Sequence, residues 1–261
     1  MVNRVIYVKG GPLPIPRKNL ARLLAIEMNE SDSTSVVVAM GKTGVGKSIY
    51  AMKIAHEFYK DWNNVLDYIV FTPFDFQEMI DYLEANDLWI PILIWDDAGP
   101  WMELMKRTSW HPLTIGIRGA LETMRIRIGA LILTMTNERS LPRSIRYNGN
   151  IYKFRAKIVR CGRNAKYPLS LAEIQVRKEK RSDWGSYYWD TSVIYRDKFT
   201  LHTPNYSEYE ILRKAYVKLY NKLIMASRTI GPSKILDYIY NEWKKMRNDL
   251  PRKPIYWGEG S

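Results

Sequence analysis

One stretch of eight residues constrains the fold of this chain more than any other part of it. An apolar run at residues 36–40 precedes the stretch, and residues 49–62 follow it with a helical pattern. Its glycines permit the tight turns that point successive backbone N–H groups at one phosphate, and the N-terminus of the helix adds positive charge. The pattern therefore predicts a strand, a phosphate-binding loop and a helix, with the loop formed by Gly41, Lys42, Thr43, Gly44, Val45, Gly46, Lys47 and Ser48.

The residues that close this loop predict a nucleoside triphosphate as the ligand. Lys47 is placed to reach the β- and γ-phosphates, and the hydroxyl of Ser48 is suited to ligate Mg²⁺. A glycine-rich turn without a ligand is the alternative, which the strand before the loop and the helix after it disfavour. We therefore expect ATP and Mg²⁺ as cofactors.

A second apolar run ends in two carboxylates. Residues 91–95 are apolar, and Asp96 and Asp97 follow directly. Ligands of open α/β sheets bind at the carboxyl edge of the strands. We expect Asp96 to hold Mg²⁺ through water and Asp97 to orient or deprotonate the attacking water. A second carboxylate at this place favours hydrolysis over phosphoryl transfer to a small substrate.

A third apolar run, residues 131–135, ends in Thr136 and Asn137. We expect this run to be a strand inserted between the two strands already described. Asn137 is then the better candidate for a catalytic sensor of the γ-phosphate or the attacking water, because an amide both donates and accepts hydrogen bonds. The alternative is that these residues only cap an element, which is a common role of Asn and Thr.

Helical patterns alternate with short apolar runs along the first 147 residues. This alternation is typical of an α/β fold in which a parallel sheet is covered by helices. The pattern then changes to strands at residues 151–159, 171–176 and 187–195, and finally to two helices. We predict a phosphate-loop (P-loop) ATPase core over residues 1–147, a basic β-rich extension over 148–203 and a C-terminal helical segment over 204–261.

Two features predict where the C-terminal helices begin. Ser207 and Glu210 have the spacing of a capping box, and Pro232 suits the first turn of a second helix. Apolar residues at helical spacing follow each of these starts. We expect both stripes to be packing faces, formed by Leu212, Ala215, Tyr216, Leu219 and Leu223 in the first helix and by Ile235, Ile239 and Trp243 in the second.

Basic charge is concentrated in the second half of the chain. The net charge is +13; residues 141–261 carry 25 basic and 11 acidic side chains, whereas residues 1–140 carry 15 and 16. A basic block attached to a nucleotide-binding core favours binding to nucleic-acid phosphates. A solvated basic face and an acidic membrane surface are the alternatives. We expect DNA as a partner and no association with a membrane.

Composition also bears on location. No apolar run approaches the roughly 18 residues of a membrane span, and the first residues lack the pattern of a signal peptide. Cys161 is the one cysteine of the chain, which excludes a disulfide within it and fits a reducing compartment. We therefore expect an intracellular, cytoplasmic protein.

In this order the three motifs resemble the additional-strand P-loop ATPases, which include the AAA+ and RecA/FtsK-like groups. Residues 136–146 resemble the sensor-1 region and following arginine of replication initiators and helicase loaders, and residues 95–97 are similar to the acid strand of the DnaA/DnaC-like clade. Residues 33–147 look most like the DnaA-like ATPase of spindle-shaped viruses and plasmids of thermophilic archaea. Asp97 departs from the pattern, since most such enzymes have Glu there.

The resemblance implies a DNA-directed, Mg²⁺-dependent ATP hydrolase in replication initiation or helicase loading on a viral or plasmid genome. It also implies a homo-oligomer, a helicase or other replication protein as a partner, and the host cytoplasm if the chain is viral. An FtsK/HerA-like motor for DNA translocation or packaging is the first alternative. A nucleotide switch without hydrolysis is the second, which the shorter side chain of Asp97 leaves open. A helical lid in residues 148–200 would favour the loader, and added strands would favour the motor.

Overall fold

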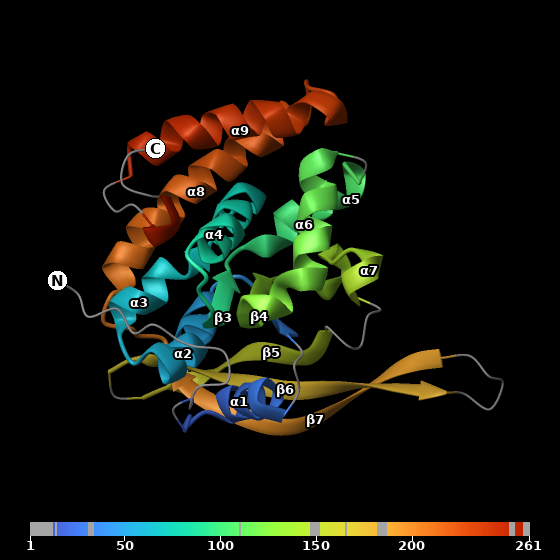
Figure 1. Ribbon diagram of the computed structural model, residues 1–261. Helices are drawn as coiled ribbons and strands as arrows, with labels where there is room; N and C mark the ends of the chain where they lie inside the picture. The colour runs from blue at the N-terminus through green and yellow to red at the C-terminus, as the bar shows by residue number, and fades with distance from the viewer. Residues whose placement is uncertain are drawn as a thin grey trace.

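A seven-stranded sheet forms the centre of the molecule (Figure 1). The computed structural model describes residues 13, 15–30, 34–109, 111–146, 152–164, 166–181, 187–250 and 254–257. The strand order is β2-β3-β4-β1-β5-β6-β7. The strands are β1 (Ser35–Met40), β2 (Ile69–Val70), β3 (Ile90–Trp95), β4 (Ile128–Met135), β5 (Tyr152–Arg163), β6 (Pro168–Arg181) and β7 (Tyr187–Thr200).

The sheet is mixed, not parallel throughout. Strands β2, β3, β4, β1 and β5 are parallel neighbours, and β6 and β7 join them in antiparallel register. The reason is that short connections follow β5 and β6, and a short connection can join only antiparallel neighbours. The predicted insertion of β4 between β1 and β3 is confirmed. Strands β5 to β7, which the sequence placed in a separate extension, continue the sheet of the core.

Helices cover both faces of the sheet. Helices α1 and α2 contact each other and strands β1, β3, β4 and β7, whereas α4 contacts β2 and α6, and α5 contacts β4. None of the helices in the described part of the chain combines the length and apolar character that a membrane span requires. The helices are α1 (Asn19–Glu30), α2 (Lys47–Tyr59), α3 (Trp62–Asp67), α4 (Pro73–Ala85), α5 (Ala98–Arg107), α6 (Pro112–Thr123), α7 (Arg143–Arg146), α8 (Tyr206–Ala226) and α9 (Pro232–Asn248), with 3₁₀ turns η1 (Met124–Ile126), η2 (Glu138–Ser140) and η3 (Ile255–Trp257).

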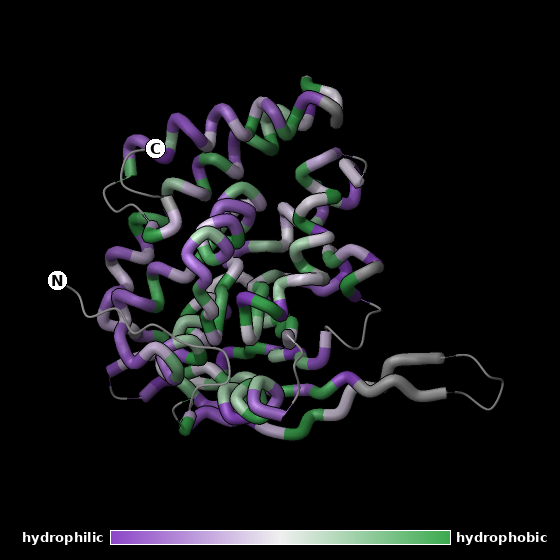
Figure 2. Tube along the Cα trace, viewed as in Figure 1, coloured by the Kyte–Doolittle hydropathy of each residue, from purple (hydrophilic) through white to green (hydrophobic). Residues whose placement is uncertain are grey.

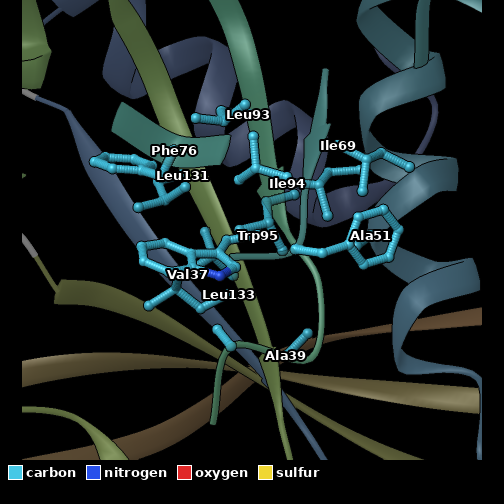
Figure 3. Packing of buried hydrophobic residues seen from close by; sticks show 14 of the residues in the cluster. Val37, Ala39, Ala51, Ile69, Phe76, Leu93, Ile94, Trp95, Leu131 and Leu133 are labelled. Carbon is cyan, nitrogen blue, oxygen red and sulfur yellow. The ribbon is translucent and has the colours of Figure 1, made fainter. Parts of the chain in front are cut away.

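The core lies on the two faces of the central strands. Every residue of β3 and β4 is buried, as expected of strands that helices cover on both sides. Phe76 of α4 stacks on Trp95 of β3, with ring centroids 5.0 Å apart. Figure 3 shows this pair on one side of the strands and Ala51 of α2 on the other. Figure 2 shows the same segregation along the chain, since hydrophobic residues gather in the central strands while α8 and α9 are mixed.

The C-terminal helices pack as their stripes predicted, but one predicted start is wrong. Helix α9 begins at Pro232, and all the predicted stripe residues are buried except Ala215, which is partly buried. The capping box at Ser207 and Glu210 does not form. Helix α8 begins at Tyr206, so Ser207 lies inside its first turn and not at the N-cap position. The N-cap residue is Asn205, whose side-chain amide donates to Asn63 rather than capping the helix.

A buried carboxylate joins α4 to the C-terminal helices. Asp75 forms a capping box with Thr72 at the start of α4. Its other oxygen accepts hydrogen bonds from the hydroxyl of Tyr216 in α8 at 2.9 Å and from the indole N–H of Trp243 in α9 at 3.0 Å. Asp75 is fully buried. One side chain therefore holds three helices together through four donated hydrogen bonds.

We expect Asp75→Asn to lower the free energy of unfolding by about 3 kcal/mol, because an amide cannot accept from all four donors and each buried donor without a partner costs about 1–3 kcal/mol. Burial raises the pKa of the Asp75 carboxyl, and its hydrogen bonds offset part of the rise. The folded chain then holds this proton more tightly than the unfolded chain, whose value is near 3.8. The stability that Asp75 contributes is therefore full below that pH and declines as pH rises through the folded pKa.

Urea denaturation of the wild type and Asp75→Asn across this pH range measures both effects. The difference in unfolding free energy between the two proteins should shrink as pH rises. Asp81→Asn is the matched control, since Asp81 lies on the exposed side of the same helix and bonds only to Gln77. A difference that grows with pH would contradict the raised pKa.

Candidate functional site

The predicted loop lines a pocket at the carboxyl edge of β1, β3 and β4. The pocket has a volume of about 530 Å³, which is the size of a site for a small organic ligand. Five separate parts of the chain contribute the polar side chains that line it. They are Thr43, Lys47 and Ser48 of the loop and α2, Asp97 after β3, Thr136 after β4, Arg160 of β5, and Tyr206, Tyr209 and Arg213 of α8.

The loop has the backbone that its glycines allow. Gly44 and Gly46 have φ of +80° and +96°, in the region that side chains disfavour, and α2 begins at Lys47. A Cβ on Gly41 would lie 2.4 Å from the carbonyl oxygen of Ile158 in β5. The glycines therefore serve two purposes, since two permit the turns and one lets the loop lie directly against the sheet.

Strands β5 and β6 hold the loop from outside. The guanidinium of Arg160 donates to the carbonyl of Gly44 at 2.7 Å, and the hydroxyl of Ser170 donates to the carbonyl of Val45 at 2.7 Å. Sequence reasoning assigned neither residue to the site. Their contacts make the β-rich strands part of the site.

Lys47 lies folded back over the loop. Its ammonium donates to the carbonyls of Gly41 and Lys42, at 3.2 and 3.1 Å. Burial lowers the pKa of Lys47, and the nearby carboxylates of Asp97 and Asp96 act in the opposite direction. The ammonium thus lies at the mouth of the loop, where a phosphate would replace the two carbonyls as its partner.

Thr134 fixes the two carboxylates after β3. Its hydroxyl donates to Asp96 at 2.6 Å and accepts the backbone N–H of Asp97 at 2.8 Å. Asp96 is fully buried, and Asp97 has a left-handed backbone with φ of +48°. A left-handed aspartate is a strained conformation that its surroundings must impose. The one sequence signal for Thr134 was a polar residue inside the otherwise apolar run of β4.

Helix α8 supplies two residues that sequence reasoning did not assign to the site. The hydroxyl of Tyr209 donates to Asp96 at 2.5 Å. Arg213 donates from Nε to one oxygen of Asp97 at 2.9 Å, and its Nη2 forms an ion pair with the same oxygen at 2.8 Å. Tyr209 and Arg213 lie one helical turn apart, on the side of α8 that continues to Tyr216. A charged arginine on a side of the helix that is otherwise apolar was the sequence signal that could have identified them.

The charged groups of this cluster shift the pKa values of their neighbours. Burial raises the pKa of the Asp97 carboxyl, the charge of Asp96 adds to the rise, and Arg213 opposes it. Burial raises the pKa of Tyr209 far above its ordinary value, as does the charge of Asp96. Burial alone would lower the pKa of Arg213, but Tyr209, Asp97 and Asp96 outweigh it. The arginine therefore stays charged and neutralises one of two adjacent carboxylates.

The structure brings Lys47, Ser48, Asp96 and Asp97 together but directs Asn137 elsewhere. The side-chain oxygen of Asn137 accepts the backbone N–H of Arg139 at 2.9 Å and caps η2. This is the capping role that stood as the alternative. Thr136, its neighbour, lines the pocket instead.

The oxygens of Ser48 and Asp96 suit a magnesium ion. Asp96 accepts from the hydroxyl of Tyr209, and Tyr209 lines the same pocket as Ser48. Mg²⁺ prefers hard oxygen ligands and usually takes only one or two from the protein, with phosphates and waters completing the shell. Within the described residues no group of three or more His, Cys, Asp or Glu side chains forms a metal cage. The donor set thus fits a metal that arrives with a phosphate ligand.

The loop glycines give a testable difference. We expect Gly44→Ala to cost about 1–2 kcal/mol of folding free energy, since an alanine there adopts a left-handed backbone but meets no atom within 4 Å. Gly41→Ala should cost more, because its Cβ would collide with the backbone of β5. Urea denaturation of both variants measures the costs. Equal costs would show that the loop does not lie against β5.

Comparisons with known proteins relate the chain to viral proteins. No family model matches it. It is 32% identical over 107 residues to the uncharacterized protein ORF286 of Acidianus two-tailed virus, a match that covers 40% of this chain and 37% of that protein. It is 27% identical over 208 residues to the uncharacterized protein B-251 of Sulfolobus spindle-shape virus 1, across 73% of this chain and 78% of that protein. The chain is thus similar to proteins of two viruses and spans little more than a third of the first.

Proposed function

We propose that the chain is a Mg²⁺-dependent ATP hydrolase of the P-loop type that acts on DNA. One observation carries the proposal: Lys47, Ser48 and Asp97 line one pocket beside a glycine loop, and the buried Asp96 accepts from Tyr209, which lines the same pocket. The loop glycines, the helix N-terminus at Lys47 and the ammonium of Lys47 suit a chain of phosphates. The insertion of β4 between β1 and β3 supports the additional-strand class of these ATPases.

The roles of the residues follow from their places. Lys47 would exchange the carbonyls of Gly41 and Lys42 for phosphate oxygens. Ser48 and Asp96 would hold Mg²⁺, which supplies charge neutralisation on the β- and γ-phosphates when bound. Asp97, whose pKa is raised, would accept a proton from the attacking water. Thr134 positions both carboxylates, and Thr136, which lines the pocket, would take the sensor role that was expected of Asn137.

The added strands favour a motor among the DNA-directed functions. Residues 152–200 contribute β5, β6 and β7 rather than a helical lid, which supports an FtsK/HerA-like translocation or packaging motor. One observation favours replication initiation or helicase loading as the second candidate. Arg213 of the C-terminal helix α8 reaches Asp97, and AAA+ proteins usually have such an arginine in a helical lid that follows the core. A homo-oligomer, a replication partner and a cytoplasmic location stay predictions from the resemblance.

The outer face of β5 to β7 suits the phosphates of DNA. Lys157, Glu173 and Arg196 are direct neighbours across the three strands, so they share a face, and Lys198 follows two residues along β7. All three cations are exposed. The opposite face of the same strands is buried, where Asp197 bonds to Asn19 of α1 and Tyr50 of α2.

A two-stranded ribbon extends this basic region. Figure 1 shows β6 and β7 continuing beyond the other strands. The sequence of β6 has four cations within residues 177–181. A two-stranded antiparallel ribbon fits the major groove of B-DNA. Position and charge together support DNA as the partner.

The hydrolase proposal predicts different defects for two residues. Lys47→Ala should lose affinity for ATP, because the loop loses its cation. Asp97→Asn should still bind ATP but turn it over about 10²–10⁴-fold more slowly, since a general base contributes that much. Steady-state ATPase rates and binding of a fluorescent ATP analogue, with and without DNA, separate the two effects.

Asp87→Asn is the control for these variants, because Asp87 is an exposed aspartate that pairs with Arg127 outside the pocket. Its rate should equal that of the wild type. ATP binding without hydrolysis in the wild type would favour the nucleotide switch. An unchanged rate in both Lys47→Ala and Asp97→Asn would contradict the site.

The DNA surface predicts a change in salt dependence. We expect the double variant Lys157→Gln, Lys198→Gln to bind duplex DNA more weakly and to reduce the slope of log affinity against log salt by about 0.9 per lost phosphate contact. Fluorescence anisotropy at several salt concentrations measures the slope. The control is Lys234→Gln, Lys244→Gln in α9, which removes the same charge from another exposed surface. A larger effect of the control would move the DNA surface to the C-terminal helices.

A further inference from the structure

Side chains of helix α8 already bond to Asp96 and Asp97, the two carboxylates that a metal and a nucleotide would need. Asp96 accepts from Thr134 on one oxygen and from Tyr209 on the other. Asp97 accepts from Nε of Arg213 and forms an ion pair with its Nη2 through the same oxygen. Of these partners, Thr134 belongs to the sheet, but the tyrosine and the arginine come from a helix more than a hundred residues away in the sequence.

The hydroxyl of Tyr209 lies where the magnesium ion would bind. It donates to Asp96, one of the two proposed ligands, at 2.5 Å, and it lines the same pocket as Ser48, the other. A metal held by Asp96, directly or through water, needs the carboxylate oxygen to which the tyrosine now donates. The tyrosine hydroxyl and the metal therefore compete for that oxygen.

Arg213 occupies the second carboxylate, that of Asp97, in the same way. Its guanidinium holds Asp97 through two nitrogens and lies 3.9 Å from Asp96. A carboxylate that is neutralised by a hydrogen-bonded guanidinium is a poor acceptor for the proton of water. Asp97 can act as a base only after Arg213 releases it.

We propose that the first two turns of α8 form a latch that closes the magnesium site in the nucleotide-free protein, and that Mg²⁺ with a nucleoside triphosphate opens it. This inference rests on the proposed function, because it names how the same site is regulated. The phosphates would draw Arg213 from Asp97, and the metal would displace the hydroxyl of Tyr209.

The anchors of α8 show which part of the helix is free to respond. Tyr216 is fixed to Asp75, which also holds Trp243 of α9. The two latch residues lie before this anchor. Opening the site therefore shifts the start of α8, while its later part and α9 stay fixed to Asp75.

The test compares the wild type with Tyr209→Phe, which removes the hydroxyl and keeps the ring near Phe71 and Tyr206. We expect the variant to bind a fluorescent, non-hydrolysable ATP analogue on the order of tenfold tighter in Mg²⁺, the equivalent of one lost competing hydrogen bond to a charged group. Without Mg²⁺, in EDTA, its affinity should equal that of the wild type, because the hydroxyl competes only with the metal.

A second measurement follows the helix itself. Hydrogen exchange of residues 206–213 in the wild type should become faster when Mg²⁺ and the analogue are added, and Lys47→Ala should show no such change. Lys214→Gln is the charge control, since Lys214 follows Arg213 but pairs with Glu210 on the exposed side; its affinity should equal that of the wild type.

Two outcomes would overturn the latch. One is equal or weaker binding by Tyr209→Phe in Mg²⁺, and the other is slower exchange of residues 206–213 on nucleotide binding. Failure of the proposed function has a different signature. In that case neither the wild type nor the variant binds the analogue, with Mg²⁺ or without it.

Discussion

The buried carboxylate of Asp96 is the group around which the site is assembled. A carboxylate removed from water is stable only when protein donors replace its solvent, and here β4 and α8 supply them through Thr134 and Tyr209. Satisfying this one group fixes the spacing of β3 and β4 and docks the start of α8 at the carboxyl edge of the sheet. The backbone of Asp97 follows, because Thr134 also accepts its N–H.

The same arrangement explains a tension between stability and chemistry. A pair of adjacent carboxylates repels itself, and Arg213 relieves this repulsion by neutralising Asp97. Every contact that makes the resting site stable also makes it less available to a metal and to water. A protein that hydrolysed ATP here would need to exchange internal partners for ligand atoms, so the energy of nucleotide binding would be directed into movement of a helix.

The strands after residue 151 belong to this assembly as much as the nucleotide loop does. Arg160 and Ser170 bond to loop carbonyls, and Gly41 lies directly against the backbone of β5. The outer face of these strands carries exposed cations. A ligand on that face would therefore be one strand away from the loop. Under the proposed function, this proximity would give the sheet a short mechanical route between bound DNA and bound nucleotide.

The sequence by itself determined the local units: the strand, glycine loop and α2, the strand ending in Asp96 and Asp97, and the inserted strand β4. Each is encoded within about twenty residues, by apolar periodicity and by glycines that permit one kind of backbone turn. Both signals can be recognised without knowledge of distant contacts. Only the tertiary structure decided that β5 to β7 extend the core sheet, that Asn137 caps a turn, and that Tyr209 and Arg213 reach the acid pair. The contacts of β5 with β1, and of Tyr209 and Arg213 with the two aspartates, join residues 113 to 117 apart in the sequence. Apolar periodicity identifies a packing face but not the distant surface that the face meets. The cap formed by Asn137 is local, but the same residues suit a cap and a sensor equally well.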